Sequence, residues 1–112
     1  NLSAETEAVH PGLMDELFVI YFETFKSHLN ELEIKVKGQD SIGSTKIAHF
    51  MKGQSACVGL MYCRDQFLKI EEMIKLKKFK SIMDILLDLN AKEPDFRHES
   101  DRYLKNRRGE LV

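Results

Sequence analysis

The residues with the clearest chemical potential lie in one short stretch, residues 47–59. On a helical wheel, Lys52, Gly53 and Ala56 fall beside His49, within one or two turns of it. The apolar residues of the stretch fall on the opposite side: Ile47, Met51 and Val58. An outward imidazole is largely neutral at pH 7, so a ring nitrogen can attack an electrophile, and a lysine one turn away can offset the charge of a phosphoryl group. The spacing favours a phosphoryl-accepting histidine, and the plain alternative is a surface histidine without a chemical role.

The glycine in the middle of this stretch is itself informative. Gly53 costs a helix about 1 kcal/mol relative to alanine, so its presence calls for a reason. Four residues after His49, it removes a side chain that would obstruct a group approaching the imidazole. This fits a histidine that meets a partner.

One histidine, one lysine, one serine and two glycines stand in a fixed order: His49-x-x-Lys52-Gly53-x-Ser55-x-x-x-Gly59. This string resembles the signature of histidine-containing phosphotransfer (HPt) domains, the small intermediates of multistep two-component phosphorelays, and is most similar to their free-standing eukaryotic type. The likeness is close over this helix and extends loosely across residues 13–105. Gln54 departs from it, because a small residue is usual at that position.

The resemblance implies a role for each residue of the string. His49 would be the phosphorylated residue, through Nε2, and Lys52 would steady the phosphoryl oxygens. Gly53 would permit close docking of the partner, and Ser55 would support the site. Gly59 would let this helix turn into the next one.

Two residues of the following helix, Glu71 and Lys75, stand where members of this family often place polar groups near the histidine. Glu71 could hydrogen-bond the second imidazole nitrogen, but its negative charge would also repel a phosphate. A solvated ion pair between Glu71 and Lys75, four residues apart on one helix, fits the sequence equally well.

The resemblance also implies the partners. A phosphoryl group would pass from an aspartyl phosphate on the receiver domain of a hybrid histidine kinase to His49, and from there to the receiver aspartate of a response regulator. The sequence shows no carboxylate cluster suited to Mg²⁺ and no glycine-rich ATP loop, so we expect the receiver to supply the metal and most catalytic groups. The protein would be a phosphoryl carrier without a cofactor of its own, rather than an enzyme.

The size and charge of the chain limit the alternatives. Its 112 residues predict one domain, 1–112, which we expect to be a monomer. Its net charge of −1 argues against nucleic acid as the primary partner. Residues 1–33 hold seven acidic side chains and one lysine, a net charge of −6, whereas the remainder carries +5. This polarity either orients a protein partner or reflects solvated helix faces. No apolar run approaches the roughly 18 residues that cross a bilayer, so no membrane is expected as a partner.

The cysteines and the other histidines give little support to other chemistry. Cys57 and Cys63 both lie on predicted helices, so we expect reduced thiols, as in a cytoplasmic or nuclear protein. No histidine belongs to a metal-binding spacing, and His28 is expected at the core edge with a hydrogen-bond partner. A metal-binding bundle and a hydrolase are therefore disfavoured. A bundle that serves only as a scaffold or interaction module remains the main alternative.

Helices must position these residues. Apolar residues at steps of three and four predict helices at 13–37, from Ser44 or Thr45 to Gly59, at about 60–76, and from Phe79 onwards. The second helix is expected to turn four residues inward: Ile47, Phe50, Met51 and Val58. The fold class is therefore all-α, an antiparallel up-down-up-down four-helix bundle, with at most a short additional helix at 3–9.

Proline interrupts the last helical pattern at Pro94. Proline normally breaks a helix interior, yet Phe96 and Tyr103 continue the seven-residue spacing from Leu89. We therefore expect one kinked helix, or two nearly coaxial ones, to about Leu104. A frayed tail is expected at 106–112, beyond a bundle core at about 13–105.

The first predicted helix is more apolar than a core-facing helix requires. Its apolar positions span about twice the minimum stripe in the N-terminal half. Either the segment from Leu2 to Val9 packs over the excess, or Met14, Phe18 and Phe22 stay partly exposed beside His49. In the second case they would form a docking patch together with Ala56, as the HPt resemblance implies.

Overall fold

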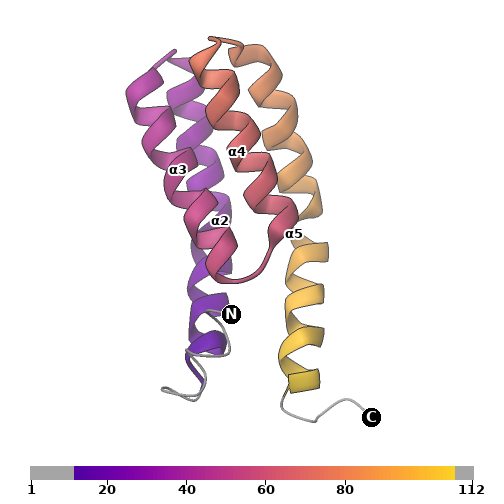
Figure 1. Ribbon diagram of the computed structural model, residues 1–112. Helices are drawn as coiled ribbons and strands as arrows, with labels where there is room; N and C mark the ends of the chain where they lie inside the picture. The colour runs from indigo at the N-terminus through magenta and orange to yellow at the C-terminus, as the bar shows by residue number, and fades with distance from the viewer. Residues whose placement is uncertain (1–11, 108–112) are drawn as a thin grey trace.

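The computed structural model of the chain describes residues 12–107, which are almost entirely helical. The elements follow one another as α2 (Leu13–Lys37), α3 (Ser41–Cys57), α4 (Met61–Lys75) and α5 (Phe79–Arg107). Consecutive helices run in opposite directions, each packs against the next, and α5 closes the bundle against α2 (Figure 1). The predicted all-α four-helix bundle is therefore confirmed. The short helix expected at 3–9 lies outside the described residues.

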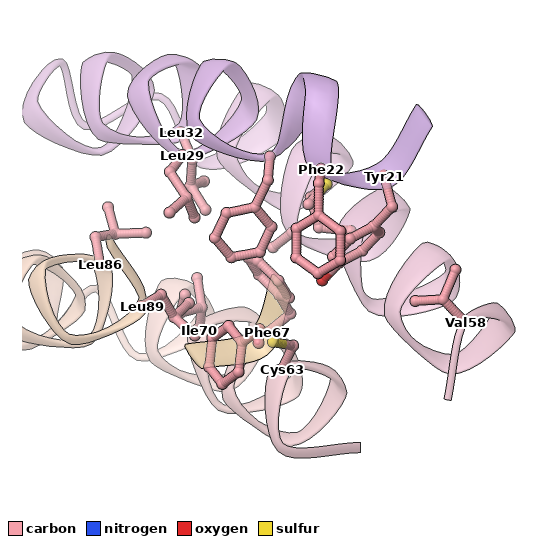
Figure 2. Close-up of a cluster of buried hydrophobic side chains, with 14 of the residues drawn as sticks. Tyr21, Phe22, Leu29, Leu32, Val58, Cys63, Phe67, Ile70, Leu86 and Leu89 are labelled. Atoms are coloured by element: carbon pink, nitrogen blue, oxygen red, sulfur yellow. The ribbon is translucent and has the colours of Figure 1, made fainter. Parts of the chain in front are cut away.

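The interior of the bundle is built from apolar side chains of all four helices. Figure 2 shows the labelled side chains converging on it. The fully buried side chains include large aromatic, branched and thioether ones: Phe25, Phe67, Met14, Leu29, Leu32, Met51, Ile70, Ile82 and Leu89. Burying one such side chain stabilises a fold by roughly 1.5–3 kcal/mol, so this interior fixes how the helices lie against each other.

The N-terminal half of α2 buries the three apolar residues that the sequence analysis left as either covered or partly exposed. Met14, Phe18 and Phe22 are buried, whereas Ile20 is 55% exposed. The reason is the unequal length of the helices, because α2 and α5 extend beyond the turn that joins α3 to α4 (Figure 1). There α2 packs against α5, and the Phe18 ring lies 6.1 Å from that of Tyr103.

The start of α3 is earlier than predicted. The Asp40 carboxylate caps it by accepting a 2.9 Å hydrogen bond from the Gly43 amide, and the helix begins at Ser41. Ser44, which the sequence suggested as a cap, is buried inside the helix, where its hydroxyl donates to the Asp40 carbonyl. The connection from α2 is consequently only three residues long, 38–40.

The inner face of α3 also differs from the predicted stripe. Met51 and Val58 are buried as expected, but Ile47 is only half-buried and Phe50 is 50% exposed. Small side chains take the inner positions instead: Ser44, Ala48 and Ser55. Small residues let neighbouring helices approach closely, and the closest packing in the bundle is that of α3 against α4.

The last helix is continuous through Pro94. Of the two expected arrangements, the single helix is the one observed, with Leu89 and Phe96 buried on either side of the proline. The helix continues through 106 and 107, which were expected in the tail, and residues 108–112 lie outside the described part of the chain. Within residues 12–107, neither α5 nor another helix combines the length and apolar character needed to cross a membrane.

Candidate functional site

His49 projects from the outer face of α3 and contacts α4. Its side chain is 71% exposed, and Nδ1 lies 3.4 Å from Oε2 of Glu71 on α4. The sequence placed His49 opposite the core, and the structure confirms that position. The second ring nitrogen, Nε2, lies on the edge of the imidazole away from the one that faces Glu71.

Lys52 lies one turn after His49 and contacts the same carboxylate. Its Nζ is 2.7 Å from Glu71 Oε1, and the Glu71 side chain is only 13% exposed. Oε1 is otherwise without a hydrogen-bond partner, so the contact is an ion pair and not a well-aligned hydrogen bond. Glu71 thus connects the imidazole and the ammonium across two helices.

Lys75 does not take part in this cluster. It is exposed one turn beyond Glu71, and the ion pair that Glu71 forms is with Lys52. The alternative of a Glu71–Lys75 pair along α4 is therefore wrong. The interhelical pair is favoured because it offsets the charge of a carboxylate that α3 partly covers.

The two glycines of the motif occupy different surroundings. Gly53 is exposed in the middle of α3, and a Cβ added there would meet nothing within 4 Å. Packing within the described chain therefore does not require glycine at this position. Gly59 has φ +76°, a left-handed conformation that favours glycine, and lies in the turn between α3 and α4 as predicted.

Ser55 lies on the inner side of α3, away from the imidazole. Its hydroxyl is fully buried, donates to the Met51 carbonyl at 2.7 Å, and lies 2.8 Å from the Tyr21 hydroxyl of α2. Since the single hydroxyl hydrogen of Ser55 goes to Met51, Tyr21 is the donor of the second bond. Ser55 therefore holds α3 against α2. The next residue, Ala56, is exposed on the outer side of the helix.

The α2 part of the predicted docking patch is wrong, whereas Ala56 on α3 is exposed. Met14, Phe18 and Phe22 are buried, and Phe22 faces α5, where the guanidinium of Arg97 lies 5.4 Å from its ring. The wheel placed them correctly on α2, but it could not show that this part of α2 meets α5. The other expected cover, the segment from Leu2 to Val9, lies outside the described residues.

Two other apolar side chains are exposed near His49. Phe50 is its neighbour on α3, and Leu68, 41% exposed, lies one turn before Glu71 on the same face of α4. Sequence reasoning missed Phe50 because its type and its step of three from Ile47 suggested the core. Leu68 carried no signal of its own in the sequence, because its nearness to His49 depends on how α3 and α4 align.

A shallow groove lies on the other side of α3. It has a volume of about 300 Å³ and is lined by residues of α2 and α3: His28, Glu31, Lys46, Ile47 and Phe50. The His28 ring lies 5.3 Å from that of Phe50, and its Nδ1 is buried without a hydrogen-bond partner. The partner expected for His28 is therefore missing at Nδ1.

The remaining reactive side chains are separated from one another. Within residues 12–107, no group of three or more His, Cys, Asp or Glu side chains is placed to hold a metal ion. Cys57 and Cys63 are free thiols, as predicted. Burial raises the pKa of the Cys63 thiol to about 11.

Comparisons with protein-family models, with curated proteins and with solved structures give no match. The function of the chain is therefore inferred from its residues and their geometry.

Proposed function

We propose that this chain is a phosphoryl carrier of the HPt type. It accepts a phosphoryl group on His49 from the aspartyl phosphate of a hybrid kinase receiver domain and passes it to the aspartate of a response regulator. The observation that carries the proposal is the exposed His49 imidazole, of which Nδ1, and not Nε2, contacts a carboxylate. A motif of His, Lys and Gly at the same spacing as in HPt domains supports it.

The surroundings of His49 suit transfer between two proteins. Gly53 leaves open space four residues away, so a receiver domain can bring its aspartyl phosphate close to the imidazole. Lys52 is near enough to turn from Glu71 toward phosphoryl oxygens, where a cation offsets the charge of a loose, metaphosphate-like transition state. The receiver supplies Mg²⁺ and the remaining catalytic groups.

The docking surface in this proposal differs from the one expected from sequence. Phe50 of α3 and Leu68 of α4 are exposed apolar side chains, and Gly53 and Ala56 are exposed small residues on the same helix as His49. Such a surface suits a folded domain that presents a helix and loops. The proposal places the protein as a monomer in the cytoplasm, with entry into the nucleus when its response regulator is there.

The decisive experiment offers the protein a ³²P-labelled receiver domain and compares His49→Gln with wild type. We expect wild type to take up label within minutes and His49→Gln to lose at least 100-fold of that uptake. His98→Gln, which changes another exposed histidine on α5, is the matched control and should keep wild-type uptake. Equal labelling of wild type and His49→Gln would refute the proposal.

The docking surface is tested separately with the same assay. Phe50→Ala should raise the receiver concentration needed for half-maximal transfer about five- to tenfold, because it removes an exposed ring beside the imidazole. Leu87→Ala removes an exposed apolar side chain of α5 and should change nothing. An effect of Leu87→Ala equal to that of Phe50→Ala would place the receiver elsewhere.

One observation favours a second candidate, a bundle that only mediates protein interactions. Lys52 is already paired with Glu71, as a purely structural ion pair would be. In that case no receiver labels the chain, while binding of a partner survives His49→Gln.

A further inference from the structure

One end of the bundle is rich in lysine. The turn from α2 to α3 and the turn from α4 to α5 both lie at this end, away from the start of α2 and the end of α5 (Figure 1). Residues 34–42 and 75–80 form it, and we call them the lysine tip. They contain one acidic residue, Asp40, and six lysines, a net charge of +5: Lys35, Lys37, Lys75, Lys77, Lys78 and Lys80.

Most of this charge is not neutralised within the fold. The ammonium of Lys35 lies 3.8 Å from the Asp40 carboxylate, and that of Lys37 lies 3.9 Å from Glu33. In residues 12–107, no ion pair involves the four exposed lysines at the turn from α4 to α5: Lys75, Lys77, Lys78 and Lys80. Four ammonium groups in so short a segment create a positive field that attracts an anionic partner.

The lysine tip also holds the two most exposed large apolar side chains of residues 12–107. Ile42, in the first turn of α3, is 73% exposed, and Leu76, directly after α4, is 65% exposed. Because α3 and α4 are antiparallel and closely packed, the first turn of α3 is level with the end of α4. Two protruding apolar side chains within a cationic surface indicate a contact in which both become covered.

The composition of the lysine tip fits a lipid surface better than a protein surface. Its cations are all lysines, whereas the arginines of residues 12–107 lie elsewhere: Arg64, Arg97, Arg102 and Arg107. Arginine recognises carboxylates in a fixed geometry, and lysine is depleted from protein interfaces. Ile42 and Leu76 project from the end of the bundle, and a bilayer surface accepts such side chains without a pocket of matching shape.

We propose that the lysine tip binds the surface of membranes that contain anionic lipids. The ammonium groups lie among the lipid headgroups, and Ile42 and Leu76 insert as far as the boundary of the acyl chains. A surface contact of this kind needs no apolar run long enough to span the bilayer. Charge attraction and shallow insertion each contribute modestly, so the binding is reversible.

The opposite end of the molecule is suited to face away from such a membrane. The first half of α2, 13–25, contains three acidic residues and no lysine or arginine: Asp15, Glu16 and Glu23. An anionic surface repels this end and attracts the lysine tip, so the charge distribution orients the bundle. His49 lies eight residues after Ser41, about 12 Å along α3, and stays accessible beside the tip. The proposal therefore does not rest on the carrier function.

The test measures how much of the purified chain sediments with lipid vesicles. We expect binding to vesicles of phosphatidylcholine with about 40% phosphatidylserine, and no binding to phosphatidylcholine alone. Raising the NaCl concentration from about 0.05 M to about 0.5 M should release most of the protein, because salt screens the charges. Absence of binding to the anionic vesicles at low salt would overturn the proposal.

Two triple variants with the same change in net charge locate the contact. The first changes the tip: Lys75→Gln, Lys77→Gln and Lys78→Gln. The second changes three exposed lysines outside it: Lys26→Gln, Lys69→Gln and Lys105→Gln. The first should weaken binding about 100-fold, since each lysine at an anionic surface contributes about fivefold, and the second should bind nearly as wild type does. Equal losses would mean that only the total charge matters and would overturn the proposal.

The apolar side chains distinguish a membrane from an acidic protein. Ile42→Ser combined with Leu76→Ser should weaken binding to the anionic vesicles about tenfold or more, because two inserted side chains are lost. Leu87→Ser, which changes an exposed leucine of α5, is the matched control and should bind as wild type does. A double variant that binds as tightly as wild type would show that charge alone is recognised, as in an acidic protein segment, and the lipid proposal would be wrong.

His49→Gln separates this inference from the proposed function. It should bind anionic vesicles as wild type does, because His49 lies outside the lysine tip. A chain that accepts a phosphoryl group but does not bind the vesicles overturns only the lipid proposal. A chain that binds the vesicles and accepts no phosphoryl group overturns only the carrier function.

Discussion

The inner and outer faces of α3 both carry polar side chains that reach a neighbouring helix, but they do so in opposite ways. On the inner face, Ser55 is fully buried and takes part in short hydrogen bonds with Met51 and Tyr21. On the outer face, His49 is largely exposed and its contact with Glu71 is long. One helix thus combines a closed polar pair and an open polar cluster.

The difference separates what holds the bundle together from what remains available to a partner. Buried polar groups must be satisfied inside the fold, because an unsatisfied one costs about 1–3 kcal/mol. Exposed groups can form hydrogen bonds with water, so replacing their contacts by contacts with another molecule costs little free energy. We therefore expect changes on the inner face to alter stability and changes on the outer face to alter transfer.

The largest expected effect on stability comes from alkaline pH and involves the bundle interior that the inner face of α3 meets, where Tyr21 of α2 bonds Ser55 and Cys63 of α4 is buried. Burial raises the pKa of Cys63 from 9.0 to about 11, and it also raises that of Tyr21 above its ordinary value. As the pH rises, the unfolded chain loses these protons first, so the free energy of unfolding should fall from about pH 9, and the part that Cys63 contributes should be complete near pH 11. The share of Cys63 is about 2–3 kcal/mol, measurable by urea denaturation.

Two cysteine variants check the origin of that fall. Cys63→Ala should delay its onset to about pH 10, where Tyr21 begins to contribute, while Cys57→Ala should leave the onset unchanged. An unchanged onset in Cys63→Ala would mean that the thiol is not the titrating group.

A smaller effect is expected from the closed polar pair itself. Tyr21→Phe removes the hydroxyl that bonds Ser55 and should lower the free energy of unfolding by about 1–2 kcal/mol, without changing label uptake at His49. Tyr62→Phe provides the matched control, since the hydroxyl of Tyr62 bonds Asp88 at the exposed surface. The control should cost less than about 0.5 kcal/mol. Equal losses would remove the distinction between buried and exposed pairs.

The smallest expected effect has opposite signs for stability and transfer. Gly53→Ala should raise the free energy of unfolding by about 0.5–1 kcal/mol, because alanine is the better helix former and its Cβ meets no other atom. The same methyl group should slow transfer from the receiver, because it occupies the space that the partner enters. A variant that is more stable and equally fast would show that the partner does not approach Gly53.

The sequence predicted the parts of the molecule that depend on local pattern. The four helices, the turn at Gly59 and the outward position of His49 all follow from periodicity within one segment. The Asp40 cap was missed because Ser44 and Thr45 are equally good caps in isolation. The actual start depends on the short connection from α2.

The errors concern contacts between segments. A wheel cannot show that α2 extends beyond α3 and contacts α5. Phe18, for which a place beside His49 was one of two alternatives, packs against Tyr103 instead. The Glu71–Lys52 pair was missed for the same reason, because it depends on how α3 and α4 align. The long contact between Glu71 and the imidazole was suggested by resemblance alone, and periodicity carried no sign of it.

The central claim is that His49 carries a phosphoryl group on Nε2. Its most direct measurement is phosphorus and nitrogen-15 NMR of the chain after incubation with a phosphorylated receiver domain, combined with peptide mapping at alkaline pH. We expect one acid-labile, base-stable phosphate, bonded to Nε2 of His49. A phosphate on Nδ1, a phosphate on another residue, or an unlabelled His49 would contradict the claim.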